Sequence, residues 1–184
     1  MELIAKILFC GDGKVGKTAL RKNYMGEKFS SKYMITIGAD LSIKEIKLKV
    51  NSTDYNLKFF LWDLAGQPAF NIVRPRYYQG GSAALLVYDI SNRNSFDNIQ
   101  NWINELITHN REFPIPLVLI ANKSDLKDKI NNPVSTSDGQ SLAKNYSEQF
   151  DQEVFFLETS ALTGENVRLI FENLGRVIIN KSSR

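Results

Sequence analysis

The stretch Gly11-Asp12-Gly13-Lys14-Val15-Gly16-Lys17-Thr18 decides the fold expected for this chain. It fits the pattern G-x-x-x-x-G-K-[ST] and directly follows Leu3 to Cys10, an apolar run that predicts a strand. Glycines let the backbone pass close to phosphate oxygens, and the N–H groups of such a loop point inward and bind anions. The alternative is a plain glycine-rich turn before a helix, but the preceding strand favours a phosphate site.

Each residue type in this loop suits the binding of a phosphate chain with magnesium. Lys17 reaches the β- and γ-phosphates, and the Thr18 hydroxyl binds Mg²⁺. The helix that begins here adds the positive end of its dipole. The nucleotide-binding residues expected in the loop are Gly11, Gly13, Lys14, Val15, Gly16, Lys17 and Thr18.

Composition favours an ordinary globular protein. The chain has 184 residues, which suggests one domain over 1–184, and its hydrophobic share of 43% is typical of a folded core. A net charge of +3, with no dense basic run, argues against nucleic-acid binding. The single cysteine, Cys10, excludes an internal disulfide and is expected to be an inert core thiol.

We find no run of about 18 apolar residues and no signal-peptide pattern, so neither a membrane span nor secretion is expected. A cytoplasmic protein is the prediction, with a peripheral membrane protein as the alternative if a lipidated tail is missing from this sequence.

Apolar patterns predict strands alternating with helices. Leu41 to Val50 and Tyr55 to Asp63 form a hairpin around the turn Asn51–Asp54. Continuous apolar runs, typical of strands buried on both faces, are Ala83–Asp89, Leu117–Ala121 and Val154–Leu157. Lys17 to about Met25 is expected to be the helix after the phosphate loop, and helical periodicity marks Ile99 to Ile107 (with Trp102 as core) and Val167 to Ile178.

This order predicts an α/β fold: a six-stranded, mostly parallel sheet with one antiparallel edge strand and helices on both faces. In such sheets ligands bind beyond the carboxyl ends of the strands. The remaining motifs all follow predicted strands.

Asp63-Leu64-Ala65-Gly66-Gln67 follows the second strand of the hairpin. Asp63 is expected to hold Mg²⁺, usually through a water. The Gly66 N–H can approach a terminal phosphate, and the amide of Gln67 can orient an attacking water. The motif alone would indicate only a turn.

Asn122-Lys123-Ser124-Asp125 follows the strand that ends at Ala121. A carboxylate can accept from N1–H and N2–H₂ of guanine, a donor pair that adenine lacks, so Asp125 is the candidate for base selection. We expect Asn122 to tie this loop to the phosphate loop and the Lys123 stem to cover the base. A plain surface turn is the alternative.

Glu158-Thr159-Ser160-Ala161-Leu162 follows the last strand. Backbone N–H groups of Ser160 and Ala161 are candidates to donate to guanine O6. The alternative is the N-terminal region of the final helix, and the two interpretations are compatible.

The ordered set GDGKVGKT, Thr36, DLAGQ, NKSD and ETSAL resembles the Ras superfamily of small GTPases, from about Leu3 to Ile179. Thr36-Ile37-Gly38-Ala39-Asp40, Trp62-Asp63 and Tyr77-Tyr78-Gln79-Gly80-Gly81 are similar to the Rab group. The resemblance implies a P-loop NTPase three-layer fold, GTP or GDP with Mg²⁺ as ligands, and a monomer.

The resemblance also implies roles for single residues. Thr36 would bind Mg²⁺ and the γ-phosphate, Phe29 would contact the base edge-on, and Tyr33 would lie over the phosphates. Catalytic roles fall to Gln67, Lys17 and Thr36, metal binding to Thr18, Thr36 and Asp63, and further nucleotide contacts to Gly66, Asn122, Lys123, Asp125, Ser160, Ala161 and Leu162. Residues from about Phe29 to Gly38 and Leu64 to Tyr77 would be switches that order with the γ-phosphate.

Three features depart from the family pattern. Pro68 follows Gln67 where relatives usually carry an acid, and it disfavours a helical backbone at Gln67. Lys14 stands where a small residue is common. The tail Asn180–Arg184 has no cysteine, so prenylation and membrane attachment are not encoded in this chain.

We identify no arginine that would complete the site from within the chain. Arg74 and Arg76 are expected to be solvated or to face partners, and His109 to be exposed without a catalytic role. An activating partner would then supply an arginine.

We therefore predict a GTPase switch that contacts effectors, an activating protein and an exchange factor, with a Rab-like role in membrane trafficking. One alternative is a GTP-binding interaction module with negligible hydrolysis, which Pro68 keeps open. The other is a P-loop kinase or ATPase, which would lack Asp125.

Overall fold

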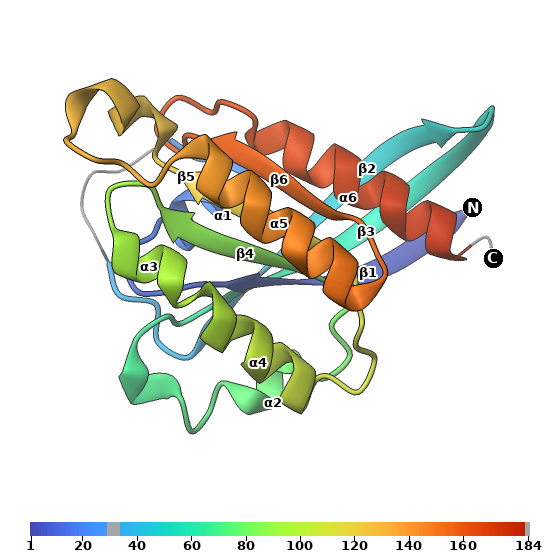
Figure 1. Ribbon diagram of the computed structural model, residues 1–184. Coiled ribbons are helices and arrows are strands. Elements are labelled where there is room, and N and C mark those ends of the chain that lie inside the picture. Colours follow the sequence, from blue (N-terminus) through green and yellow to red (C-terminus); the bar gives the residue numbers. More distant parts are fainter. Residues whose placement is uncertain (29–33, 183–184) are drawn as a thin grey trace.

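The computed structural model describes residues 1–28 and 34–182 of the chain. Its centre is a six-stranded sheet in the order β2-β3-β1-β4-β5-β6. The strands are β1 (Glu2–Cys10), β2 (Ala39–Val50), β3 (Thr53–Leu64), β4 (Ala83–Asp89), β5 (Leu117–Asn122) and β6 (Val154–Thr159). Only β2 is antiparallel, paired with β3, and it lies at the edge. The predicted sheet is confirmed (Figure 1).

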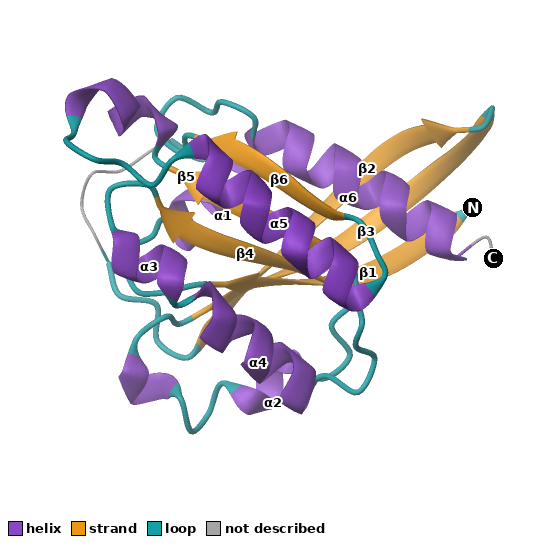
Figure 2. Cartoon of the chain, in the orientation of Figure 1, coloured by secondary structure: helices purple, strands orange, loops and turns teal. Residues whose placement is uncertain are grey.

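Helices cover both faces of the sheet (Figure 2). Helices α1 (Lys17–Met25) and α6 (Val167–Ser182) pack on one face, around Leu20, Phe59 and Phe171. The other face carries α2 (Pro75–Tyr78), α3 (Arg93–Asp97), α4 (Ile99–His109) and α5 (Thr136–Phe150). Short 3-10 turns occupy Pro68–Phe70 and Ser124–Lys129. None of the helices described is both long and apolar enough to cross a membrane.

Burial follows the sequence patterns. All residues of β4 are buried, as expected for a parallel strand covered on both faces. Cys10 is fully buried, and burial raises the pKa of its thiol to about 12, which confirms a core thiol. Ile107 is an exception: it was placed on the apolar stripe of α4 but is 43% exposed, because it lies at the margin of the buried face.

Helix α5 was not predicted, because small residues stand at two of the three buried positions on its inner face. Gly139, Ala143 and Tyr146 are buried, and Leu142 and Phe150 pack partly buried against the same core. The N-terminus does carry a sequence signal. Ser135 Oγ accepts from the N–H of Asp138, and the Ser135 N–H donates to Asp138 Oδ2, so the two residues form a capping box.

We predict that Gly139→Ala lowers stability, although alanine favours helices by about 1 kcal/mol. A Cβ at Gly139 would lie 2.2 Å from a ring carbon of Phe156 and 2.7 Å from the Tyr88 hydroxyl. Overpacking of this kind costs about 1–3 kcal/mol. Urea unfolding measures the change, with the exposed Ser141→Ala of the same helix as the control. Equal stability of the two variants would show that the α5–β6 contact is looser than the structure indicates.

Candidate functional site

The loops that follow the parallel strands meet at one edge of the sheet, toward which β4 and β6 point (Figure 1). They enclose a cavity of about 580 Å³, a size typical of small-molecule sites. The phosphate loop and the segment after β3 contribute predicted residues, namely Gly13, Lys14, Gly16, Lys17, Thr18, Gly66 and Gln67, and Thr36 lines it too. At its other end the cavity is lined by Asn122, Lys123, Asp125, Ala161 and Leu162. Residues 29–33, and with them Phe29 and Tyr33, lie outside the described residues.

The charge of this cavity suits a polyphosphate. Among the described residues, its lining includes the lysines Lys14, Lys17, Lys22, Lys28 and Lys123 and one acid, Asp125. Cations around a concave, partly enclosed site concentrate anionic ligands there. The one acid lies among the residues predicted to bind the base rather than the phosphates.

Gly16 allows the phosphate loop to pack against the loop after β5. Its φ is 103°, and a Cβ there would lie 2.2 Å from Nδ2 of Asn122. The same Nδ2 donates to the Val15 carbonyl at 2.8 Å. The predicted tie between the two loops is therefore present, and it needs a glycine at position 16.

Lys17 lies inside the loop and is 5% exposed. Its Nζ donates to the carbonyls of Gly11 at 2.6 Å and Asp12 at 2.8 Å. Burial lowers the pKa of Lys17 to about 8, against the opposing influence of Asp63. The charge of this lysine thus depends on pH close to the physiological range.

Three oxygen-bearing side chains predicted to hold Mg²⁺ come together. The hydroxyls of Thr18 and Thr36 lie 3.1 Å apart, and Thr18 donates to Asp63 Oδ2 at 2.5 Å. Asp63 Oδ1 is buried and has no hydrogen-bond partner among the described residues. Burial raises the pKa of Asp63, while the Thr18 hydrogen bond and the charge of Lys17 oppose the rise. Hard oxygen donors beside an unsatisfied buried carboxylate fit Mg²⁺.

The segment after β3 lies directly against the phosphate loop. A Cβ at Gly66 would be 2.5 Å from the Gly11 carbonyl, so only glycine permits this approach. The side chain of Gln67 lies 3.6 Å from the position of a Cβ on Gly13. Gln67 has φ −81° and ψ 145°, the extended backbone expected before Pro68.

At the other end of the cavity, Ser160 orients Asp125. The Ser160 hydroxyl donates to Asp125 Oδ1 at 2.6 Å. The ammonium of Lys123 pairs with Asp89, and its stem lines the cavity. The structure thus brings together the residues predicted to recognise a base.

The two amides predicted to bind guanine O6 both have acceptors within the chain. The Ser160 N–H donates to the Glu165 carbonyl, and the Ala161 N–H donates to Asn122 Oδ1, each at 3.2 Å. These bonds are long for N–H···O. Ala161 lines the cavity and Ser160 does not, so of the two it is the Ala161 amide that can be shared with a ligand.

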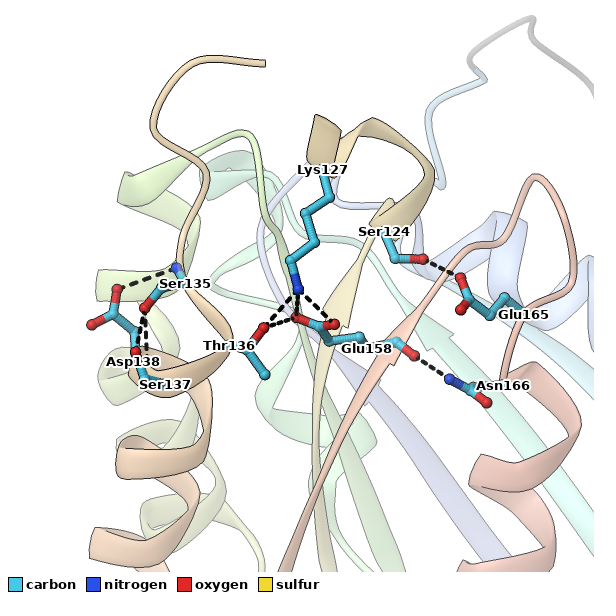
Figure 3. A network of polar contacts seen from close by, with 9 residues as sticks. All are labelled: Ser124, Lys127, Ser135, Thr136, Ser137, Asp138, Glu158, Glu165 and Asn166. Carbon is cyan, nitrogen blue, oxygen red and sulfur yellow. Dashed lines mark hydrogen bonds and ion pairs between the residues drawn. The ribbon is translucent and has the colours of Figure 1, made fainter. Parts of the chain in front are cut away.

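A network of polar side chains supports the base end of the cavity (Figure 3). Lys127 Nζ donates to both oxygens of Glu158 at 2.9 and 3.0 Å and to the Thr136 hydroxyl at 2.7 Å. Ser124 donates to Glu165 at 2.6 Å. These contacts tie the loop of Asp125 to the loop of Ser160, and the sequence motifs alone did not indicate them.

Two predictions for single residues are wrong. Arg74 was expected to be solvated, but it is 3% exposed and donates to both oxygens of Glu105 and to the Ala65 carbonyl. Burial alone would lower the pKa of Arg74, yet the hydrogen bonds and charge of Glu105 raise it. His109 is half-buried and stacks on Tyr78 with centroids 6.1 Å apart. Arg76 is exposed, as predicted.

Trp102 was expected to serve only the core. Its ring is buried, but its Nε1 donates to Asp12 Oδ1 of the phosphate loop at 2.8 Å. Asn98 Nδ2 donates to the other carboxylate oxygen, also at 2.8 Å. Sequence motifs could not indicate these contacts, because Asn98 lies 86 residues and Trp102 lies 90 residues from Asp12.

This combination defines the class of the protein: a P-loop fold with a site for a phosphorylated nucleoside. The family model described as Ras family matches residues 6–180. Ras-related protein RABA5a of Arabidopsis thaliana is 39% identical over 183 residues, which cover 100% of this chain and 77% of the relative. Human Ras-related protein Rab-8B is 37% identical, with 100% and 82% covered. Ras-related protein SEC4 of Candida albicans is 36% identical, with 98% and 80% covered.

The chain therefore belongs to the Ras family and is a Rab-like small GTPase, an enzyme that acts on GTP. The resemblance to small GTPases that the motifs indicated from about Leu3 to Ile179 is therefore confirmed over nearly all of that range.

We predict that binding of GDP takes up protons near pH 8. Lys17 has a pKa of about 8 in the structure, and a diphosphate beside its ammonium would raise that pKa. Above pH 8 the lysine must regain a proton to bind, so affinity falls as the pH rises. Calorimetry at pH 8 in buffers of different ionisation enthalpy measures the uptake. Lys22→Met, which removes another lysine of the cavity, should retain it; buffer-independent heats would contradict the assignment to Lys17.

Proposed function

We propose that the cavity holds GTP or GDP with Mg²⁺ and that the whole chain, 1–184, is one switch domain. The observation that carries this proposal is that one cavity is lined by both Lys17, from the phosphate loop, and Asp125, which is suited to guanine. A kinase or ATPase would have no use for such an acid at the base end. Membership of the Ras family supports the same choice.

In this proposal each residue has a defined task. Lys17 neutralises phosphate charge, and the hydroxyls of Thr18 and Thr36 hold the metal with Asp63 beside them. Mg²⁺ supplies Lewis-acid stabilisation of charge on the phosphates. Gln67, whose side chain lies against Gly13, orients the attacking water.

Effector binding through the switch regions is supported by their exposed apolar side chains. Ile37, in the first switch region, is 80% exposed, and Ile72, in the second, is 89% exposed. Apolar residues gathered at a surface commonly mark protein interfaces. We propose that effectors, an exchange factor and an activating protein bind here, the last supplying an arginine in trans.

The Rab-like relatives support a role in membrane trafficking. We propose that the protein works in the cytoplasm or at a membrane surface.

Asp125→Asn tests the base assignment. An amide presents a donor where guanine also presents donors, so we expect preference for GDP over the xanthine nucleotide to fall on the order of 10⁴-fold or to reverse. Competition against a fluorescent nucleotide measures both affinities, with ATP as a third competitor. Asp128→Asn, an exposed acid on the same turn, is the control. Persistent preference for guanine would remove Asp125 from this role, and preference of the unaltered protein for ATP would overturn the proposed function.

Gln67→Leu tests the hydrolytic role. Leucine fills similar space but cannot hydrogen-bond to water, so single-turnover GTP hydrolysis should slow by at least about tenfold. Release of GDP should be unchanged, because the leucine alters only the reaction at the γ-phosphate. Gln79→Leu, an exposed position beyond the second switch, is the matched control. An unchanged rate would show that another group orients the water.

A further inference from the structure

The side chain of Asp12 lies between the phosphate loop and α4. Its Oδ2 accepts from Asn98 Nδ2, and its Oδ1 accepts from Trp102 Nε1, each at 2.8 Å. Hydrogen bonds to a charged acceptor are stronger than those between neutral groups. We call this arrangement, formed by Asp12, Asn98 and Trp102, the Asp12 clamp.

The main chain of Asp12 is fixed by different groups. Its carbonyl accepts from Lys17 Nζ at 2.8 Å. Its carbonyl carbon lies close to Gly66, where an added Cβ would be 2.4 Å away. Residue 12 is thus held by α4 through its side chain, and it contacts Lys17 and the segment after β3 through its backbone.

The orientation of Trp102 is itself fixed. The residue is 4% exposed, and the guanidinium of Arg74 lies 4.1 Å from the centroid of its ring. The ammonium of Lys17 lies 5.8 Å from the same ring. In this packing the indole N–H points toward Asp12.

The clamp also has an electrostatic consequence. A carboxylate in a phosphate-binding loop would repel the phosphates if it faced them. Two N–H donors, one from Asn98 just before α4 and one from Trp102 on α4, occupy its two oxygens and hold the charge on the side of that helix.

We propose that Asn98 and Trp102 are positioning residues that act through Asp12 to set how long the phosphate loop retains its nucleotide. This rests on the proposed function of the cavity as a guanine-nucleotide site. Neither residue lines the cavity, so their influence falls on the rate of nucleotide release and leaves the choice of base unchanged.

The test is a double-mutant cycle on release of a fluorescent GDP analogue from the Mg²⁺-loaded protein. Trp102→Phe keeps an aromatic side chain, though a smaller one, and removes the N–H donor, and it should speed release by about tenfold, as expected for a lost hydrogen bond to a charged group. In an Asp12→Ala background, whatever that change does alone, Trp102→Phe should have no further effect. The preference for GDP over ATP should stay the same throughout.

A charge-exchange experiment distinguishes the hydrogen bonds of the clamp from packing alone, because packing would not restore the release rate. Asn98→Asp should speed release, because two carboxylates then face each other. The exchange Asn98→Asp with Asp12→Asn restores one donor and one acceptor and should return the rate toward that of the unaltered protein. Tyr146→Phe, which removes a 2.9 Å hydrogen bond to Gln100 elsewhere on α4, is the matched control and should leave release unchanged.

The outcomes separate the clamp from the proposed function. If Trp102→Phe speeds release equally with and without Asp12, the ring acts by packing, and the clamp is wrong. If it speeds release in neither background, Trp102 has no influence on release, and the clamp is wrong as well. Failure of the exchange to restore the rate would overturn it as well. If the unaltered protein does not bind the GDP analogue, the proposed function fails first, and the clamp proposal falls with it.

Discussion

The side chain of Asn122, fully buried at the end of β5, is the interaction on which the rest of the site depends. Its Nδ2 donates to Val15 of the phosphate loop, and its Oδ1 accepts from Thr159 and from the Ala161 N–H. Because β5 pairs with β4 and β6, this one amide joins loops from separate parts of the sheet. A buried amide with its donor and acceptor both used strongly fixes local geometry. The phosphate end and the base end of the cavity are therefore set at one distance from each other.

Much of the fold could be predicted because each strand has a recognisable pattern of apolar residues within its own short segment of sequence. Continuous apolar runs such as Ala83–Asp89 are typical of a strand covered on both faces, and the phosphate loop specifies the strand and helix around it. Helix α5 escaped prediction because close packing on Phe156 needs Gly139, which weakens the helical pattern. Sequence periodicity detects large apolar side chains, and it is weakest where two elements approach so closely that only small residues fit.

In the candidate site, too, some residues could be predicted from the sequence and others could not. Lys17, Thr18 and Asp125 could be predicted as site residues because short motifs carry the expected chemistry, whereas Thr36 followed only from the family resemblance. Arg74 could not be placed, since its burial depends on Glu105, a residue of another helix. Asp12 and Trp102 belong to segments whose local patterns indicate a loop and a core stripe, and only the packing of α4 against the phosphate loop joins them. Contacts between distant side chains are set by tertiary structure, which no local pattern records.

The distribution of charge explains how one cavity serves two ends of a ligand. At the phosphate end, Lys17 is held by backbone carbonyls rather than by a carboxylate, so no ion pair has to break before it binds an anion. The nearby acid Asp12 is bound to α4, and Asp89 is neutralised by Lys123. At the base end, Asp125 accepts a hydrogen bond from the neutral Ser160 hydroxyl and is in no ion pair among its described contacts. At the phosphate end Asp63, which is suited to a metal ion, keeps one carboxylate oxygen without a hydrogen-bond partner among the described residues, and at the base end Asp125 is left to face a ligand.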